Sequence, residues 1–148
     1  MSIPWHYIRS MLKEVLLESL QQAMITVAVP RLTPIVREYT GYTVEPSGSL
    51  RIDIPGAGVV DEVLVVSRSG SFKLTITVGG VTVWDKSWGE ASRLSDNLVF
   101  LSAFQDENGL YVYHIAGIPF SNGVSVEVVN LDPVNPITFE YIICLLYT

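Results

Sequence analysis

The chain has 148 residues, a formal net charge of −6 and only 16% charged residues. This length suits one ordinary domain with a single core. Its nine Lys and Arg residues are scattered singly, whereas a nucleic-acid binder normally carries a clustered basic stripe, so we expect no nucleic-acid partner.

The mean hydropathy of the chain is +0.38, which is high for a protein that stays alone in water. The most apolar early stretch, Val15–Val29, is interrupted by Glu18, Gln21 and Gln22 and is shorter than the roughly 20 apolar residues of a membrane-spanning helix. No signal peptide is recognised, because a basic start, an unbroken apolar run and a cleavage site are not clear. We therefore expect the extra apolar surface to face other protein.

An N-terminal helix is predicted over about Pro4–Met24, with Ser2 as its cap. Its first half has one apolar face, which is what a helix lying on one core requires. The second half adds a second apolar stripe on the otherwise polar side, which implies a second partner. The residues predicted to form this assembly interface are Leu17, Leu20 and Met24. The alternative is a helix buried deeply within its own subunit.

The chain changes character near Pro46-Ser47-Gly48. Residues 29–46 contain three prolines and alternate loosely between apolar and polar, which is typical of a segment that lies extended along a surface. After this point strand patterns follow at regular spacing. We therefore predict two parts, a helix and extended arm over residues 1–47 and a β-sandwich domain over residues 48–148.

Eight strands are predicted in the second part. Val78-Gly79-Gly80-Val81 indicates a tight hairpin, because two glycines separate alternating segments. Short turns and no helical pattern after residue 48 favour a mainly β fold, an antiparallel, jelly-roll-like β-sandwich. The predicted strands are Leu50–Ile54, Val59–Ser67, Phe72–Val78, Val81–Asp85, Leu98–Phe104, Leu110–Ile115, Val124–Asn130 and Ile137–Leu146.

Two strands differ in the polarity of their faces. Phe72–Val78 alternates large apolar residues with Lys and Thr, which predicts one face in water. The final strand is apolar on both faces, with Phe139, Tyr141, Ile143 and Leu145 on one side and Ile142, Cys144 and Leu146 on the other. This pattern is typical of a strand that is central or covered by a partner.

The residues that catalysis needs are few. His6 and His114 lie in different predicted elements, and Cys144 lies in an apolar strand, where a thiolate is disfavoured. No metal-ligand spacing and no phosphate-binding loop occurs. We therefore predict a protein that is not an enzyme, with no catalytic residues, no bound metal and no cofactor.

Acidic side chains leave one alternative open. Asp53, Asp61 and Glu62 are near in sequence, and Asp106 and Glu107 share a turn. Such oxygen ligands can hold Ca²⁺, although acids at turns are usually only solvated.

The aromatic residues have the greatest potential for recognition. Trp84 and Trp88 flank a short polar segment, and Tyr111 and Tyr113 share a face of a later strand. Exposed, Trp84 and Trp88 could stack on sugar rings. The alternative, which we favour, is that they fill the core or a subunit contact.

From about Gly58 to Thr148 the chain resembles small β-sandwich virion structural proteins of tailed phages and archaeal viruses. The likeness lies in the order of its segments: a Gly-x-Val-x-x-x-Leu-Val-Val-Ser strand, then Lys73–Gly80, Gly109–Tyr113, Ile118–Phe120, Val124–Asn130 and the closing apolar strand. The resemblance implies a coat, tail or filament subunit, and it transfers no functional residue.

We therefore expect a virion structural protein that self-assembles through the sandwich and the helical arm. Its partners would be copies of itself and other virion proteins, and it would be assembled in the host cytoplasm. The alternative is a carbohydrate-binding or adhesin module that takes a sugar ligand.

Overall fold

The computed structural model describes residues 9–13 and 32–148, and the latter fold as a β-sandwich. Residues 9–13 are helical, within the predicted helix, whose other residues lie outside the described ones. The elements of the described sandwich are β1 (Pro34–Val44), β2 (Ser49–Ile54), β3 (Gly58–Ser67), β4 (Phe72–Val78), β5 (Val81–Ser87), α2 (Trp88–Leu94), β6 (Leu101–Gln105), β7 (Tyr111–Phe120), β8 (Val124–Asn130) and β9 (Ile137–Tyr147).

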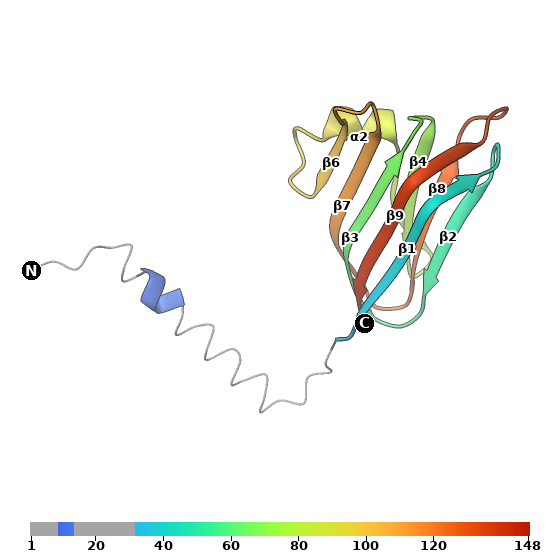
Figure 1. Ribbon diagram of the computed structural model, residues 1–148. Helices are drawn as coiled ribbons and strands as arrows, with labels where there is room; N and C mark the ends of the chain where they lie inside the picture. The colour runs from blue at the N-terminus through green and yellow to red at the C-terminus, as the bar shows by residue number, and fades with distance from the viewer. Residues whose placement is uncertain (1–8, 14–31) are drawn as a thin grey trace, which may run out of the picture. The chain divides into compact units, whose positions relative to one another are not determined.

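The strands form two sheets in two layers (Figure 1). Sheet A has the order β1-β9-β3-β7-β6 and sheet B has the order β2-β8-β4-β5. Every pair is antiparallel, and four pairs nest within one another along the chain: β1 with β9, β2 with β8, β3 with β7 and β4 with β5. This is the folded-over arrangement of a jelly roll. The predicted antiparallel, jelly-roll-like sandwich is confirmed.

The core lies between the sheets and follows from strict alternation. In β8 every second residue is buried, as is also the case in β4 from Phe72 to Ile76. Successive side chains of a strand point to opposite faces, so each of these strands has one face in the core. The largest fully buried side chains include Tyr113, Phe72 and Phe139, and the centroid of the Phe72 ring lies 5.9 Å from that of Tyr113 and 5.4 Å from that of Phe139.

The turns use the residues that their geometry demands. Gly79 and Gly80 join β4 to β5 with φ values of 55° and 82°, as the predicted two-residue hairpin requires. At the other end of the sandwich, the buried Asn130 amide donates to the backbone oxygens of Val44, Glu45 and Asn135. Asn130 therefore ties the β1–β2 connection to the turn before β9.

The structure differs from the predicted extended arm. Residues 34–44 form β1, which pairs with β9 from Pro34↔Tyr147 to Val44↔Ile137. The compact unit therefore begins at Leu32, not after residue 47. The three prolines suggested a surface strap, but Pro34 stands at the start of an edge strand, where a missing N–H is tolerated.

The absence of helix after residue 48 was also predicted wrongly. Residues 88–94 form the short helix α2, and the strand predicted from Leu98 begins only at Leu101. The Ser87 side chain accepts from the Glu90 N–H, and the Glu90 carboxylate accepts from the Ser87 N–H. This capping box was the available signal. The apolar periodicity did not predict this helix, because Ala91 is the only residue of α2 that is fully buried.

Candidate functional site

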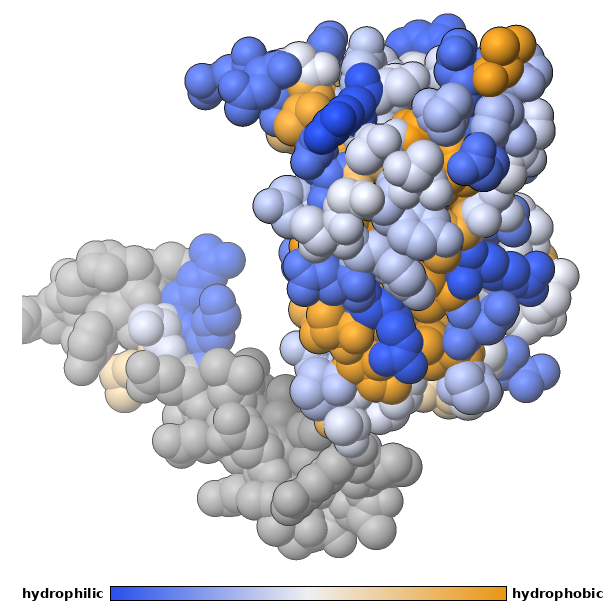
Figure 2. All heavy atoms as spheres, turned by 45° about the vertical axis from the view of Figure 1, so that its right-hand side comes forward, coloured by the Kyte–Doolittle hydropathy of each residue, from blue (hydrophilic) through white to orange (hydrophobic). Residues whose placement is uncertain are grey.

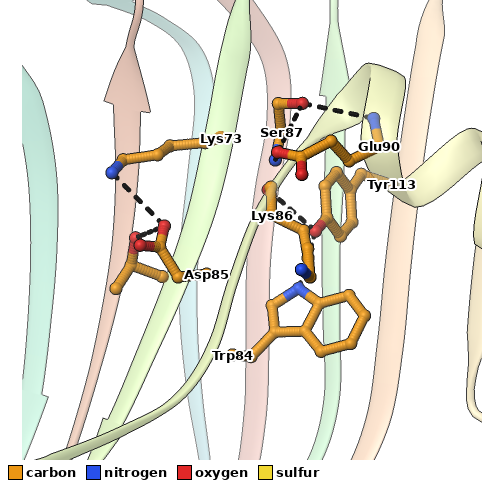
Figure 3. Close-up of polar contacts among 8 residues, drawn as sticks. Lys73, Trp84, Asp85, Lys86, Ser87, Glu90 and Tyr113 are labelled. Carbon is orange, nitrogen blue, oxygen red and sulfur yellow. Dashed lines mark hydrogen bonds and ion pairs between the residues drawn. The ribbon is translucent and has the colours of Figure 1, made fainter.

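The outer faces of the two sheets differ in chemistry. On sheet B, Lys73 forms an ion pair with Asp85 at 3.3 Å, and Thr75 donates to the same carboxylate at 3.1 Å (Figure 3). The outward positions of β2, β8 and β4 are polar except Val129, as the sequence predicted for β4: Ser49, Arg51, Asp53, Ser125, Glu127, Lys73, Thr75 and Thr77.

The outer face of sheet A is largely apolar. Neighbouring side chains on it align across strands: Tyr141 lies opposite Val66, Val66 opposite Val112, and Val112 opposite Phe104. We call this surface the apolar face, and its members are Val36, Leu64, Val66, Phe104, Val112, Tyr141, Ile143 and Leu145.

The apolar face is accessible in the described part of the chain. Relative exposures reach 54% for Val36, 49% for Phe104 and 45% for Tyr141, and the more central members are half-buried. Glu38 lies opposite Ile143, and Glu62 approaches the His114 Nε2 at 3.3 Å. The Glu62–His114 pair lies on the inner strands β3 and β7, beside Leu64, so the apolar face borders polar groups within the sheet as well as at its edge. Adjacent exposed apolar side chains are typical of a protein contact surface.

Hydrophobic side chains are visible at the surface on the side of the sandwich that Figure 2 brings forward. They form a band that widens toward the lower end, and in Figure 1 this is the end where β1 begins and β9 ends. From strand spacing and rise, we estimate the area of the apolar face at about 250 Å². A standard interface buries about 800 Å² per partner, so a stable contact would extend beyond this face.

Trp84 and Tyr113 connect the two sheets. The Trp84 Nε1 donates to the Tyr113 hydroxyl at 2.6 Å, and that hydroxyl donates to the Lys86 carbonyl at 3.0 Å. The two rings lie beside each other in Figure 3. Because its polar edge is engaged within the fold, Trp84 offers only its apolar surface to a ligand.

A groove lies at the edge of the sandwich beside Trp84. Pairing of β6 with β7 stops at Ile115. Beyond Ile115 the groove has a volume of about 450 Å³. We call this the edge groove, and its walls are Val78, Val83, Trp84, Phe100, Ile115, Ala116, Gly117, Ile118 and Pro119. With no polar side chain apart from the engaged indole, these walls favour an apolar contact.

Trp88 does not share the edge groove with Trp84. Its Nε1 donates to the Val112 carbonyl at 3.1 Å, and its ring meets Tyr111 edge to face at 4.6 Å. The two tryptophans predicted as a stacking pair therefore have separate partners, and the structure does not bring them together as one platform.

A second, polar cleft of about 320 Å³ lies at the end of sheet B, among three turns. The Arg51 Nε donates to the Asp53 Oδ1 at 3.0 Å. Hydrogen bonds from the Arg51 and Ser125 side chains hold the pKa of Asp53 below its ordinary value. The Asp53 side chain is therefore an ionised carboxylate at neutral pH. We call this the polar cleft, and its polar side chains are Arg51, Asp53, Thr77, Asn122 and Ser125.

The remaining candidates for chemistry lie apart. Cys144 is fully buried, and this burial raises the pKa of its thiol to about 11. His114 is paired with Glu62 on the outer face of sheet A, whereas Asp53 lies on the outer face of sheet B, so the suggested grouping of Asp53 with Glu62 is wrong. Among residues 9–13 and 32–148, no three His, Cys, Asp or Glu side chains are placed to hold a metal ion.

Asp106 has a structural role in its turn. Its carboxylate accepts from the Asn108 and Leu110 N–H groups at 2.9 Å. This arrangement accounts for an acid at that position without a cation.

Some predicted positions lie outside the described residues. These include His6 and the predicted assembly residues Leu17, Leu20 and Met24. Within the residues that are described, no helix is long and apolar enough to cross a membrane.

Sequence reasoning found three members of the apolar face, Tyr141, Ile143 and Leu145. It wrongly placed Phe139 with them: Phe139 lies in the core, because a register shift in the pairing of β3 with β9 interrupts the alternation between Phe139 and Tyr141. The outward residues of β9 were visible as a second apolar stripe, but their alignment with Val66, Val112 and Phe104 depends on strand order. The polar cleft was missed, because its residues come from three separate parts of the chain.

No family model and no curated protein matches this chain. Among solved structures, it is similar to dimeric latent PorU from Porphyromonas gingivalis, with 9% identity and a TM-score of 0.46, over 81% of this chain and 13% of that one. It is also similar to the CBM36-1 domain of a multidomain xylanase from the hindgut metagenome of Trinervitermes trinervoides, with 10% identity and a TM-score of 0.38. This match covers 76% of this chain and 96% of that one. A third similar structure is a carbohydrate-binding module, CBM36, in complex with calcium and xylotriose, with 10% identity and a TM-score of 0.36. This match covers 78% of this chain and 99% of that one.

Proposed function

We propose that this protein is a non-catalytic structural subunit that associates with copies of itself through the apolar face of sheet A. The observation that carries the proposal is the difference between the two outer faces. Leu64, Val66 and Ile143 lie on inner strands of sheet A and are apolar, whereas Lys73, Thr75 and Glu127 lie on the inner strands of sheet B and are polar. The difference between the faces, and not the size of the apolar face, supports a contact through sheet A, because protein contact surfaces are apolar at their core.

Burial of apolar surface would drive the association. Each square ångström removed from water contributes about 25 cal/mol, while the cost of ordering two subunits consumes much of that gain. Because the members of the apolar face are uncharged, association should persist at about 1 M NaCl, where charges are screened within about 3 Å.

A matched pair of variants tests this proposal. Val66 and Val129 are both half-buried valines on central strands, but Val66 faces outward from sheet A and Val129 from sheet B. Val66→Lys should abolish association measured by sedimentation velocity, and Val129→Lys should leave it intact. Circular dichroism shows that each variant is folded, and Val66→Thr replaces Val66→Lys if the lysine prevents folding.

Two results would contradict the proposal. One is a wild-type chain that remains monomeric at every concentration. The other is a folded Val66→Lys variant that associates as the wild type does.

A virus particle is the setting that we propose for such a subunit. The support is the resemblance of the region from about Gly58 to Thr148 to virion structural proteins. Electron micrographs of the purified chain should then show shells, tubes or filaments. Closed dimers alone would remove the support for a coat, tail or filament subunit.

A second candidate function is a carbohydrate-binding module. The observation that favours it is the polar cleft, where Arg51, Asp53 and Ser125 offer donors and acceptors beside one another. Sugar hydroxyls pair with such groups. A glycan array probed with the full chain tests it, and binding to no glycan would count against this candidate.

A further inference from the structure

We infer that the polar cleft is a binding site for a neutral saccharide, which it would hold by two adjacent hydroxyl groups. This inference rests on the second candidate function and adds the site, the ligand class and the role of each side chain. The cleft lies on the polar side of the sandwich, so its occupation is compatible with association through the apolar face on sheet A.

The charges of the polar cleft select a neutral ligand. Arg51 and Asp53 are the ionised side chains of its wall, and they form a pair at 3.0 Å. Their charges cancel, so neither an acidic sugar nor an amino sugar gains a net attraction. The depressed pKa of Asp53 supports this geometry by keeping the carboxylate ionised above acidic pH.

The hydrogen-bonding groups of the cleft suit a pair of neighbouring hydroxyls. A guanidinium has five N–H donors in a fixed plane and a carboxylate has four acceptor positions, so the bonds that Asp53 accepts from Arg51 and Ser125 leave both the guanidinium and the carboxylate with further capacity. One sugar hydroxyl can accept from Arg51 while its neighbour donates to Asp53. The hydroxyls of Thr77 and Ser125 and the amide of Asn122 can pair with the rest of the ring.

The backbone of the cleft leaves room for a ring. Gly79, Gly80 and Gly123 all have positive φ values, and a Cβ at Gly80 would meet nothing within 4 Å. Pro55 supplies an apolar wall against which the C–H face of a sugar can pack. At about 320 Å³ the cleft is near the lower limit for ligand sites, which favours a terminal sugar residue over a long chain.

The edge groove is the competing location for a sugar. Its walls include Trp84 and Phe100, but a sugar placed there would leave its hydroxyls without protein partners, which costs affinity. We therefore assign the sugar to the polar cleft.

Titration of the full chain by two-dimensional amide NMR tests the inference. The probes are D-glucose, D-galactose, D-mannose and D-xylose, with cyclohexanol as a ring that has a single hydroxyl. At least one sugar should shift the amide signals of Gly79, Gly80 and Gly123 in a saturable way, and cyclohexanol should not.

Two matched substitutions locate the site. Asp53→Asn removes the charged acceptor of the cleft, and the loss of a hydrogen bond to a charged group should weaken binding at least about tenfold. Asp85→Asn is the control, because Asp85 is also an exposed aspartate on sheet B but lies outside the cleft. It should bind as the wild type does. Ser125→Ala should weaken binding by a smaller factor.

The failures are distinguishable. If the array detects a glycan but Asp53→Asn binds it normally, or the shifts fall on Ile115–Ile118, the chain binds sugar elsewhere and the assignment of the polar cleft is wrong. If neither the array nor the NMR titration detects binding, both the inference and the second candidate function are wrong. A response to cyclohexanol equal to that of the sugars would also overturn the inference.

Discussion

At the scale of single residues, the sheets are joined by a few polar atoms within an apolar core. The Tyr113 hydroxyl is the clearest case, because it accepts from Trp84 and donates to Lys86, both on β5 of the opposite sheet. Within the described residues, no buried side-chain nitrogen or oxygen lacks a partner. Removing one partner of such a hydrogen bond lowers the stability of the fold, because the other partner stays buried without a hydrogen bond.

Tyr113→Phe should therefore lower the free energy of unfolding by about 1–3 kcal/mol, because it leaves the Trp84 N–H without its acceptor. Tyr141→Phe is the control, since Tyr141 is 45% exposed on the apolar face. Urea unfolding at neutral pH measures both. Equal stabilities for the two variants would show that the link contributes nothing.

The same hydroxyl predicts a dependence on alkaline pH. Burial raises the pKa of Tyr113 above its ordinary value of 10.0, so the folded state holds this proton more tightly than the unfolded state. Its contribution to stability should be complete below about pH 10 and should be lost as the pH rises above that value. Urea unfolding from pH 8 to pH 11, a range chosen around the ordinary tyrosine pKa of about 10, should show a steeper loss for the wild type than for Tyr113→Phe.

Cys144 should not react with thiol reagents in the native state. Burial raises the pKa of its thiol to about 11, and the thiolate is the reactive form. A chromogenic disulfide reagent at about pH 8, below the ordinary cysteine pKa, should label the chain only after urea is added. Rapid labelling of the folded chain would show that this part of β9 opens readily.

At the scale of elements, the corner near Asn130 fixes how distant segments meet. The Asn130 amide donates to three backbone oxygens, and its own oxygen accepts from the Asp132 N–H at 2.8 Å. One side chain thus satisfies several backbone groups at the β1–β2 connection and at the turn before β9, where no strand partner can do so.

Asn130→Ala should therefore destabilise the sandwich by about 3 kcal/mol, because several buried groups lose their partner together. Asn135→Ala is the control, since Asn135 is exposed and its side chain bonds only to Asp132 in the described structure. Thermal unfolding followed by circular dichroism measures both. A change in Asn130→Ala no larger than in Asn135→Ala would mean that the corner is held by the turn alone.

At the scale of the whole molecule, β1 decides where the sandwich begins. It covers one side of β9 over ten paired positions and contributes Ile35 and Tyr39 against the core. Without β1, β9 becomes an edge strand that is apolar on both faces, which is a template for aggregation.

Two truncations test this boundary. A chain of residues 32–148 should fold with β-type circular dichroism and a cooperative thermal transition. A chain of residues 48–148 should be unfolded or aggregated under the same conditions, because it lacks β1. Equal stability of the two truncations would place the boundary after residue 47 and show that β1 is dispensable.

Local pattern by itself determined the type of fold. Alternation in Phe72–Val78 predicted a strand with one wet face, and Gly79-Gly80 predicted the hairpin, because both signals depend only on neighbours in sequence. The apolar character of both faces of β9 was also visible. The tertiary structure decided what the pattern could not, namely the pairing of β1 with β9, the alignment that makes the apolar face, and the meeting of Arg51, Thr77 and Ser125 in one cleft. Strand order and register arise from contacts between residues far apart in the chain, and local periodicity carries no information about them.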